Sequence, residues 1–140
     1  MDVQAISDTL EIHDVLYDYA WACDNGDWAL LRSVFTDDAR LDYSSAGGPA
    51  GGRDQLCTWL EESLSQIQIT HVVSNVQVDL HGDDAAVRAL FYCIVMIDGQ
   101  QITTSGYYRD QLRRTSEGWR IASLTEDNRW MTSPAAVAQT

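Results

Sequence analysis

LYDYAWACDNGDWALLRSVF, from Leu16 to Phe35, is the stretch that shows how this chain is built. Its first half repeats apolar residues at helical spacing, and Asn25-Gly26 then favours a left-handed C-terminal cap. Asp24 stands just before that end, in the company of tyrosine, tryptophan and cysteine side chains. A carboxylate in this position either faces water at the helix end or lines a pocket. The stretch alone leaves both interpretations open.

Three helices are expected in the first half of the chain. The first begins near Ser7 or Asp8, either of which can cap it, with Glu11 as the partner in a capping box. After the DNGDW break a second, short helix follows, and a third shows apolar residues along one face. The predicted second and third helices cover Trp28–Phe35 and Arg53–Ile67.

The second half has the composition of β-structure. Segments rich in β-branched and aromatic residues are separated by short turns, HGDD, DGQ and SEG, at hairpin spacing. Earlier, an acidic turn (TDDA) and a strand (RLDYSS) precede a flexible loop, AGGPAGG. This order predicts an α+β fold in which three N-terminal helices pack on a curved, mixed, mostly antiparallel sheet around a cone-shaped pocket. The predicted strands are 40–45, 70–80, 84–97, 101–115 and 118–130.

A net charge of −12 on 140 residues limits the partners of the chain. Nine basic side chains cannot offset the repulsion from phosphate groups, so we expect neither nucleic acid nor an anionic membrane as a partner. The sequence shows no membrane span, and its N-terminus lacks the basic start and apolar run of a signal peptide. We therefore expect a cytoplasmic protein with one domain, residues 1–132, and a flexible tail, residues 133–140.

The sequence offers no pattern for a metal or a cofactor. Cys23, Cys57 and Cys93 are odd in number and widely spaced, which fits neither a disulfide framework nor a zinc site. His13 and His71 lack the short ligand spacing of a metal triad. The glycines of AGGPAGG have no neighbouring lysine and are not a phosphate loop. We therefore expect no metal and no cofactor.

His71 and Asp24 are the residues best suited to proton transfer. A neutral imidazole accepts a proton near pH 7, and a buried carboxylate on its other nitrogen fixes the tautomer and stabilises the imidazolium. A tyrosine hydroxyl, from Tyr19 or Tyr43, can donate a hydrogen bond to a carbonyl oxygen as it becomes an enolate. Taken alone, the residues favour a plainer interpretation, with Asp24 exposed at a helix end and His71 at a strand edge.

Three segments together resemble a known family: YDYAWACDNGDWALLRSVFTDDARLDY, THVVSNVQVDLHGDDAAV and GYYRDQLRRTSEGWRIASLTEDNRW. They are similar to the SnoaL-like branch of the cone-shaped NTF2-like superfamily, with scytalone dehydratase, bile-acid 7α-dehydratase and a dehydrochlorinase among its members. The resemblance covers residues 8–131. It implies that Asp24 and His71 form the proton-abstracting dyad of those lyases, with Tyr43 and Tyr19 at the positions of family tyrosines. A further family tyrosine falls on Cys23, which argues against scytalone as the substrate.

The resemblance implies a cofactor-independent lyase, cyclase or isomerase that acts on a small apolar, oxygenated molecule, such as a polyketide or terpenoid intermediate of secondary metabolism. Two alternatives stay open. One is a non-catalytic ligand-binding or dimerisation domain, and the other is an epoxide-opening hydrolase or cyclase, which needs a second acid beside Asp24. A homodimer is compatible with the fold, but no residue decides it. Alternation and the resemblance predict that the pocket is shaped by Tyr92, Met96, Tyr108, Asn128 and Trp130.

Overall fold

The first half of the chain contains three helices, as predicted. A computed structural model describes residues 2–132, so the predicted tail at 133–140 lies outside the described residues. None of the helices within 2–132 is both long and apolar enough to cross a membrane. The helices are α1 (Val3–Asn25), α2 (Trp28–Ser33) and α3 (Arg53–Leu64), with a 3₁₀ turn, η1 (Ser44–Ala46).

Helix α1 begins earlier than predicted. Asp2 is its cap, and the Asp2 carboxylate accepts a hydrogen bond of 2.7 Å from the backbone N–H of Ala5. The prediction of a cap at Ser7 or Asp8 was therefore wrong, because both residues lie inside the helix. Asp8 is instead buried against the sheet, where long-range contacts outweigh its local preference for a helix end.

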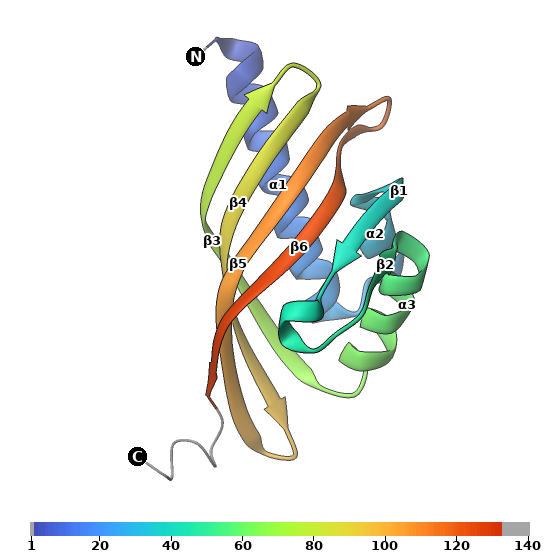
Figure 1. Ribbon diagram of the computed structural model, residues 1–140, viewed down its shortest axis with the longest axis vertical. Coiled ribbons are helices and arrows are strands. Elements are labelled where there is room, and N and C mark those ends of the chain that lie inside the picture. Colours follow the sequence, from blue (N-terminus) through green and yellow to red (C-terminus); the bar gives the residue numbers. More distant parts are fainter. Residues whose placement is uncertain (1, 133–140) are drawn as a thin grey trace.

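One six-stranded sheet forms the other layer, and its strand order is β2-β1-β6-β5-β4-β3. The four long strands pair antiparallel in succession, whereas β1 pairs parallel to β6, which makes the sheet mixed as predicted. Figure 1 shows α1 running along one face of the long strands, with α3 beside β1 and β2. The strands are β1 (Phe35–Asp42), β2 (Ala50–Gly52), β3 (Gln68–His81), β4 (Asp84–Ile97), β5 (Gln100–Thr115) and β6 (Gly118–Thr132).

The short elements between α1 and β3 depart from the predictions. Helix α2 stops at Ser33 and Phe35 already belongs to β1, so the TDDA segment lies in a strand and is no turn. The AGGPAGG segment includes β2, and α3 ends at Leu64, before the predicted Ile67. These strands are set by pairing with partners distant in sequence, such as Phe35 with Ile121, which local residue preferences do not report.

A polar cluster ties the start of α1 to the hairpin between β5 and β6. The guanidinium of Arg114 donates hydrogen bonds of 2.7 and 2.8 Å to the two carboxylate oxygens of Asp8, and Trp119 Nε1 donates to the same group at 3.2 Å. The Trp119 backbone N–H donates to Glu11 at 2.8 Å. Arg114 lowers the pKa of Asp8 far below its usual range, so this carboxylate stays charged. The cluster therefore fixes where α1 lies on the sheet.

The other end of α1 stops where the sequence predicts. Gly26 has a φ of 69°, in the left-handed region, and its N–H closes the last turn onto Ala22. The helix therefore ends one turn after the buried residues Tyr19 and Ala20. Asp24 lies in this final turn, next to the beginning of β3.

Candidate active site

Asp24 and His71 are in direct contact. Nδ1 of His71 lies 2.6 Å from Oδ1 of Asp24, and the His71 backbone N–H also donates to both carboxylate oxygens at 3.0 Å. The His71 side chain is 7% exposed and the Asp24 side chain 21%, so neither is a freely solvated surface group. Because the carboxylate accepts from Nδ1–H, Nε2 of His71 is left to accept a proton. The contact that the resemblance implied is thus present. The alternative, in which Asp24 is exposed at a helix end and does not meet His71, does not hold.

Tyr19 and Tyr43 form a second pair beside the histidine. Their hydroxyl oxygens are 2.7 Å apart, and both residues are only 3% exposed. The Tyr19 ring packs edge-on against the His71 ring, with 6.1 Å between centroids. Burial raises the pKa of each hydroxyl well above its usual value. The two groups therefore remain protonated near neutral pH, and one hydroxyl proton is free to be donated to a ligand.

A cavity of about 230 Å³ is lined by His71 and by the two tyrosines, and Asp24 contacts it only through His71. Its volume lies below the range of about 300–1,000 Å³ that is typical of sites for drug-sized ligands, which indicates a small ligand. The cavity surface is mostly apolar, with hydrophobic side chains contributed by α3, β3 and β4, and its polar groups are in the minority. The lining residues are Tyr19, Tyr43, Ala46, Gly47, Gly48, Trp59, Leu60, Leu64, Ile69, His71, Phe91, Cys93, Thr104 and Glu126.

Glu126 is a cavity residue that the sequence did not reveal. It lies on β6 opposite Tyr108 of β5, and its pKa is raised to about 7 by burial. Among residues 2–132, its carboxyl makes no hydrogen bond or ion pair with another side chain, although Ser45 Oγ donates to its backbone oxygen. A half-buried carboxyl without a side-chain partner, in the wall of a cavity, is a candidate for proton transfer.

An irregularity in β6 explains why Glu126 was missed. Trp119 and Ile121 face the core, and strict alternation from them would turn Glu126 outward. The pairing of β5 with β6 shifts after Ile121, however, and the buried face continues at Leu124. Glu126 follows Leu124 by two residues and therefore faces the cavity. In the sequence, only the apolar residue Leu124, two positions before Glu126, indicates that the Glu126 side chain faces inward.

Three residues predicted to shape the pocket lie elsewhere. Tyr92 stands between the lining residues Phe91 and Cys93, so it points to the opposite face of the sheet, where its ring lies 6.2 Å from that of Trp130. Trp130 is 47% exposed on that outer face. Met96 lines a separate hollow near the end of α3. Tyr92 and Met96 alternate with the inward-facing positions of β4, whereas a shift in the pairing of β5 with β6 turns Trp130 outward.

The other two predicted pocket residues are near the cavity but do not line it. Tyr108 is buried beneath it, with its ring 5.6 Å from that of Tyr19 and 4.8 Å from that of Phe91. Asn128 Nδ2 donates a hydrogen bond of 2.6 Å to Oγ1 of Thr104, a lining residue. Both therefore support residues that would meet a ligand.

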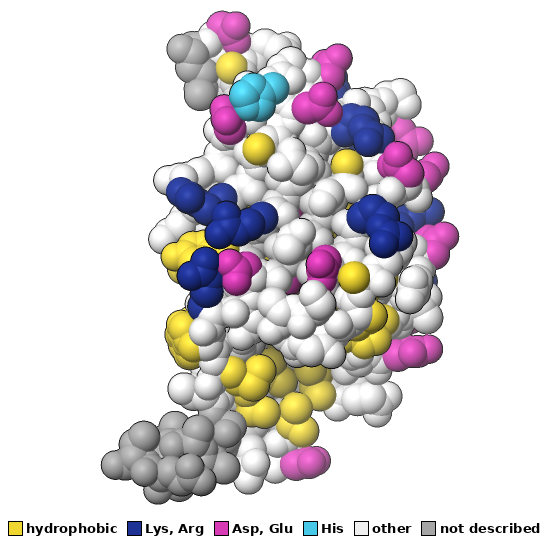
Figure 2. Space-filling view, viewed as in Figure 1, with side chains coloured by type: hydrophobic (Ala, Val, Ile, Leu, Met, Phe, Trp, Pro, Cys, Tyr) yellow, Lys and Arg dark blue, Asp and Glu magenta, His cyan; other side chains and the backbone are white. Residues whose placement is uncertain are grey.

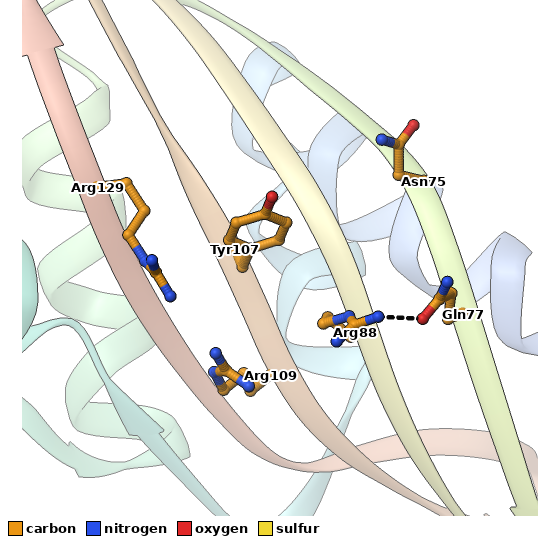
Figure 3. A pocket seen from close by; sticks show the side chains of 6 residues that line it. All are labelled: Asn75, Gln77, Arg88, Tyr107, Arg109 and Arg129. Carbon is orange, nitrogen blue, oxygen red and sulfur yellow. Dashed lines mark hydrogen bonds between the residues drawn. The ribbon is translucent and has the colours of Figure 1, made fainter.

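A second hollow, of about 430 Å³, lies on the outer face of the sheet and is built differently (Figure 3). Arg109 and Arg129 pair with Asp127 at 3.6 and 2.8 Å, and Arg88 donates to Gln77. Figure 2 shows basic side chains gathered midway along this face, interspersed with acidic ones. Arginine does not release its proton at neutral pH, so the arginines that line this hollow cannot act as the base of a proton transfer. The candidate active site is the smaller cavity.

The raised pKa of Glu126 has a consequence for stability. Between its ordinary pKa of 4.5 and about 7, the folded protein binds more protons than the unfolded chain, so stability should fall as pH rises through this window. The substitution Glu126→Gln removes the carboxyl group that ionises in this window. Relative to the wild type, the variant should gain about 3 kcal/mol between pH 4.5 and pH 8, measured by urea denaturation. Glu62→Gln, at an exposed position of α3, is the control, and equal pH profiles for all three proteins would contradict a buried Glu126.

Within residues 2–132, no three His, Cys, Asp or Glu side chains gather in a way that could hold a metal ion. The three cysteines are free and buried, and burial raises the pKa of the cavity residue Cys93 to about 12. Such a thiol is uncharged near neutral pH and is a poor nucleophile. The chemistry of the cavity is therefore that of one histidine, one glutamate and two tyrosines.

Comparison with known proteins agrees with the family suggested by the sequence. The model of the SnoaL-like domain matches residues 4–125. The uncharacterized protein Rv2910c of Mycobacterium tuberculosis is 35% identical over 130 residues, which cover 90% of this chain and 88% of that protein.

Solved structures share the fold. A candidate scytalone dehydratase from Novosphingobium aromaticivorans superposes with a TM-score of 0.85 at 20% identity, covering 94% of this chain and 91% of that one. The hexachlorocyclohexane dehydrochlorinase LinA-type3 from Novosphingobium barchaimii has a TM-score of 0.84 at 17% identity, covering 96% of this chain and 95% of that one. At 20% and 17% sequence identity, the similarity shows that these proteins share a fold. The match of the SnoaL-like domain over residues 4–125 shows that this chain belongs to the SnoaL-like family.

Proposed function

We propose that this protein is a cofactor-independent enzyme that removes a proton next to a carbonyl group, in a lyase, cyclase or isomerase reaction. The observation that carries the proposal is the contact between Asp24 and His71 at the wall of a small apolar cavity. The substrate is a small, apolar, oxygenated molecule, and a polyketide or terpenoid intermediate of secondary metabolism fits this description. The names of the two structural relatives, a dehydratase and a dehydrochlorinase, both denote eliminations, in which a substrate loses water or hydrogen chloride.

Each polar group has a part in the reaction. Nε2 of His71 accepts the proton from carbon, and the carboxylate of Asp24 stabilises the imidazolium that forms. The hydroxyl pair of Tyr19 and Tyr43 donates a hydrogen bond to the substrate oxygen as it gains the charge of an enolate. The mostly apolar wall lowers the polarity around the reacting groups, which strengthens these charge interactions.

Exchange of carbon-bound hydrogen tests the proposal without knowledge of the natural substrate. α-Tetralone, a small bicyclic ketone, is incubated with the protein in deuterated buffer, and loss of its α-proton signals is followed by NMR. We expect the wild-type protein to accelerate exchange beyond the rate in buffer. Binding of the ketone without any acceleration would instead indicate a ligand-binding domain that keeps the cavity but performs no chemistry.

The epoxide-opening alternative is not favoured by the geometry. Such an enzyme needs carboxylates arranged around a water molecule, and both oxygens of Asp24 are occupied by hydrogen bonds from His71. Glu126 supplies a second acid to the cavity, but it lies on β6 with no described carboxylate hydrogen-bonded to it. A single histidine base with a separate acid suits proton abstraction better.

A further inference from the structure

One imidazole and one carboxyl group line the cavity, and their surroundings differ. His71, on β3, has a carboxylate bound to one nitrogen, whereas Glu126, on β6, has no described side chain bound to its carboxyl. β4 and β5 separate the two strands in the sheet, so the groups approach the cavity from different sides. A pair of titratable groups whose environments differ in this way is the usual arrangement of a base and an acid in one site.

The surroundings of Glu126 favour its neutral form. The Glu126 carboxyl interacts electrostatically with Tyr43, which follows β1, with Tyr108 of β5 and with Cys93 of β4, and burial raises the pKa of each of these groups. These three groups are therefore uncharged near neutral pH, as is Tyr19 from α1. The α3 residues of the wall are Trp59, Leu60 and Leu64, which carry no charge. No arginine pairs with Glu126 among the described residues, so nothing there favours the carboxylate.

The backbone holds Glu126 in place. Ser45 of η1 donates through its hydroxyl to the Glu126 backbone oxygen, and the same hydroxyl accepts from the Asn128 backbone N–H at 2.8 Å. This bridge holds the backbone of β6 from Glu126 to Asn128, just beyond the irregularity that turns Glu126 inward. An acid fixed by its backbone, with a carboxyl left free, is preorganised to meet a ligand.

We propose that Glu126 is the general acid of this site and gives its proton to the group that leaves the substrate. This inference rests on the proposed function, and it narrows the substrate to a carbonyl compound whose leaving group is a β-hydroxyl. Hydroxide is a poor leaving group and departs readily only as water, whereas a halide leaves without a proton. A dedicated acid is therefore useful for dehydration and unnecessary for dehydrohalogenation.

The step balances in atoms and electrons. The C–H bond next to the carbonyl breaks and its proton goes to Nε2 of His71, while the electron pair forms the new C=C bond. The C–O bond at the β-carbon breaks, its electron pair stays on oxygen, and the proton of Glu126 completes a water molecule. The enzyme is left with protonated His71 and ionised Glu126, and transfer of one proton between them through solvent restores the starting state.

Two ketones that differ only in the leaving group test the role. One is the β-hydroxy ketone formed from acetone and benzaldehyde, and the other is its β-chloro analogue. Both yield benzylideneacetone, which is followed by its ultraviolet absorbance. We expect Glu126→Gln to lower the rate on the hydroxy ketone about 10²-fold or more, and at least about ten times more than on the chloro ketone. Glu62→Gln, on the exposed side of α3, should leave both rates unchanged.

The outcomes separate the two proposals. If the wild-type protein eliminates chloride but Glu126→Gln affects both ketones equally, or neither, the acid role is overturned and the base role stands. If the wild type accelerates neither elimination nor α-proton exchange, the proposed function fails, and the acid role fails with it.

A pH profile adds an independent readout. Because the pKa of Glu126 is about 7, the wild-type rate on the hydroxy ketone should fall as pH rises above this value. The chloro ketone should show no such fall, and the residual activity of Glu126→Gln should also lack it. A fall of equal size on both ketones would assign the titration to another group and would count against Glu126.

Discussion

Replacement of His71 by alanine should lower the rate of α-proton exchange by about 10³-fold or more, because general acid–base catalysis by one positioned group typically contributes about 10²–10⁴-fold. The variant loses the proton acceptor but keeps the cavity. His71 lies on a strand with partners on one side, Cys93 among them, and its backbone hydrogen bonds do not depend on its side chain. The fold should survive, as checked by circular dichroism and by binding of α-tetralone.

Asp24→Asn tests the same dyad with a smaller change. The amide has nearly the same shape but no charge to stabilise the imidazolium, so we expect a loss of about 10²–10⁴-fold in rate with little change in ketone affinity. Asp27→Asn is the matched control three residues away. It caps α2, a role that asparagine fulfils equally well, and it should retain full activity. Wild-type rates in either dyad variant would remove His71 and Asp24 from the mechanism.

Trp119→Ala should cause the largest loss of stability, about 3–5 kcal/mol in the free energy of unfolding. The side chain is 1% exposed, the Arg114 guanidinium lies 4.8 Å from its ring, and Nε1 donates to the buried Asp8. Its removal leaves a cavity, and it deprives Asp8 of a hydrogen-bond donor where water has little access. Urea denaturation at pH 7 measures the change.

Two further variants show the origin of that loss. Trp119→Phe keeps most of the ring volume but not the donor, so it should cost clearly less than the alanine variant. Trp21→Ala removes a tryptophan that is 63% exposed on α1 and should change stability by no more than about 0.5 kcal/mol. If the Trp119→Ala variant were as stable as the Trp21→Ala variant, the cluster around Asp8 would not anchor α1 as described.

The candidate site was predictable only in part. Asp24, His71, Tyr19 and Tyr43 were proposed from their chemistry and supported by a resemblance to a family. In the structure, His71, Tyr19 and Tyr43 line one cavity, and Asp24 is hydrogen-bonded to His71. The residues alone did not require this, because Asp24 and His71 are 47 positions apart and no local preference brings them together. Their contact depends on where α1 lies across the sheet, which the anchor at Asp8 helps to determine.

The residues around the dyad were predicted less well, for a geometric reason. In a strand, an error of one position moves a side chain to the opposite face. Tyr92 was placed on the wrong face because its neighbours Phe91 and Cys93 are the ones that line the cavity. Glu126 was missed because an irregular pairing in β6 changes which positions face inward.

The amino-acid sequence by itself determined the α+β class, the three helices, the four long antiparallel strands and the end of α1 at Gly26. These features follow from apolar spacing, turn residues and caps, all of which act between residues close together in the chain. The tertiary structure alone decided the pairing of β1 with β6, the approach of Asp24 to His71 and the inward turn of Glu126. Each of these depends on pairing between distant segments, and the energy of that pairing is not visible in any local pattern.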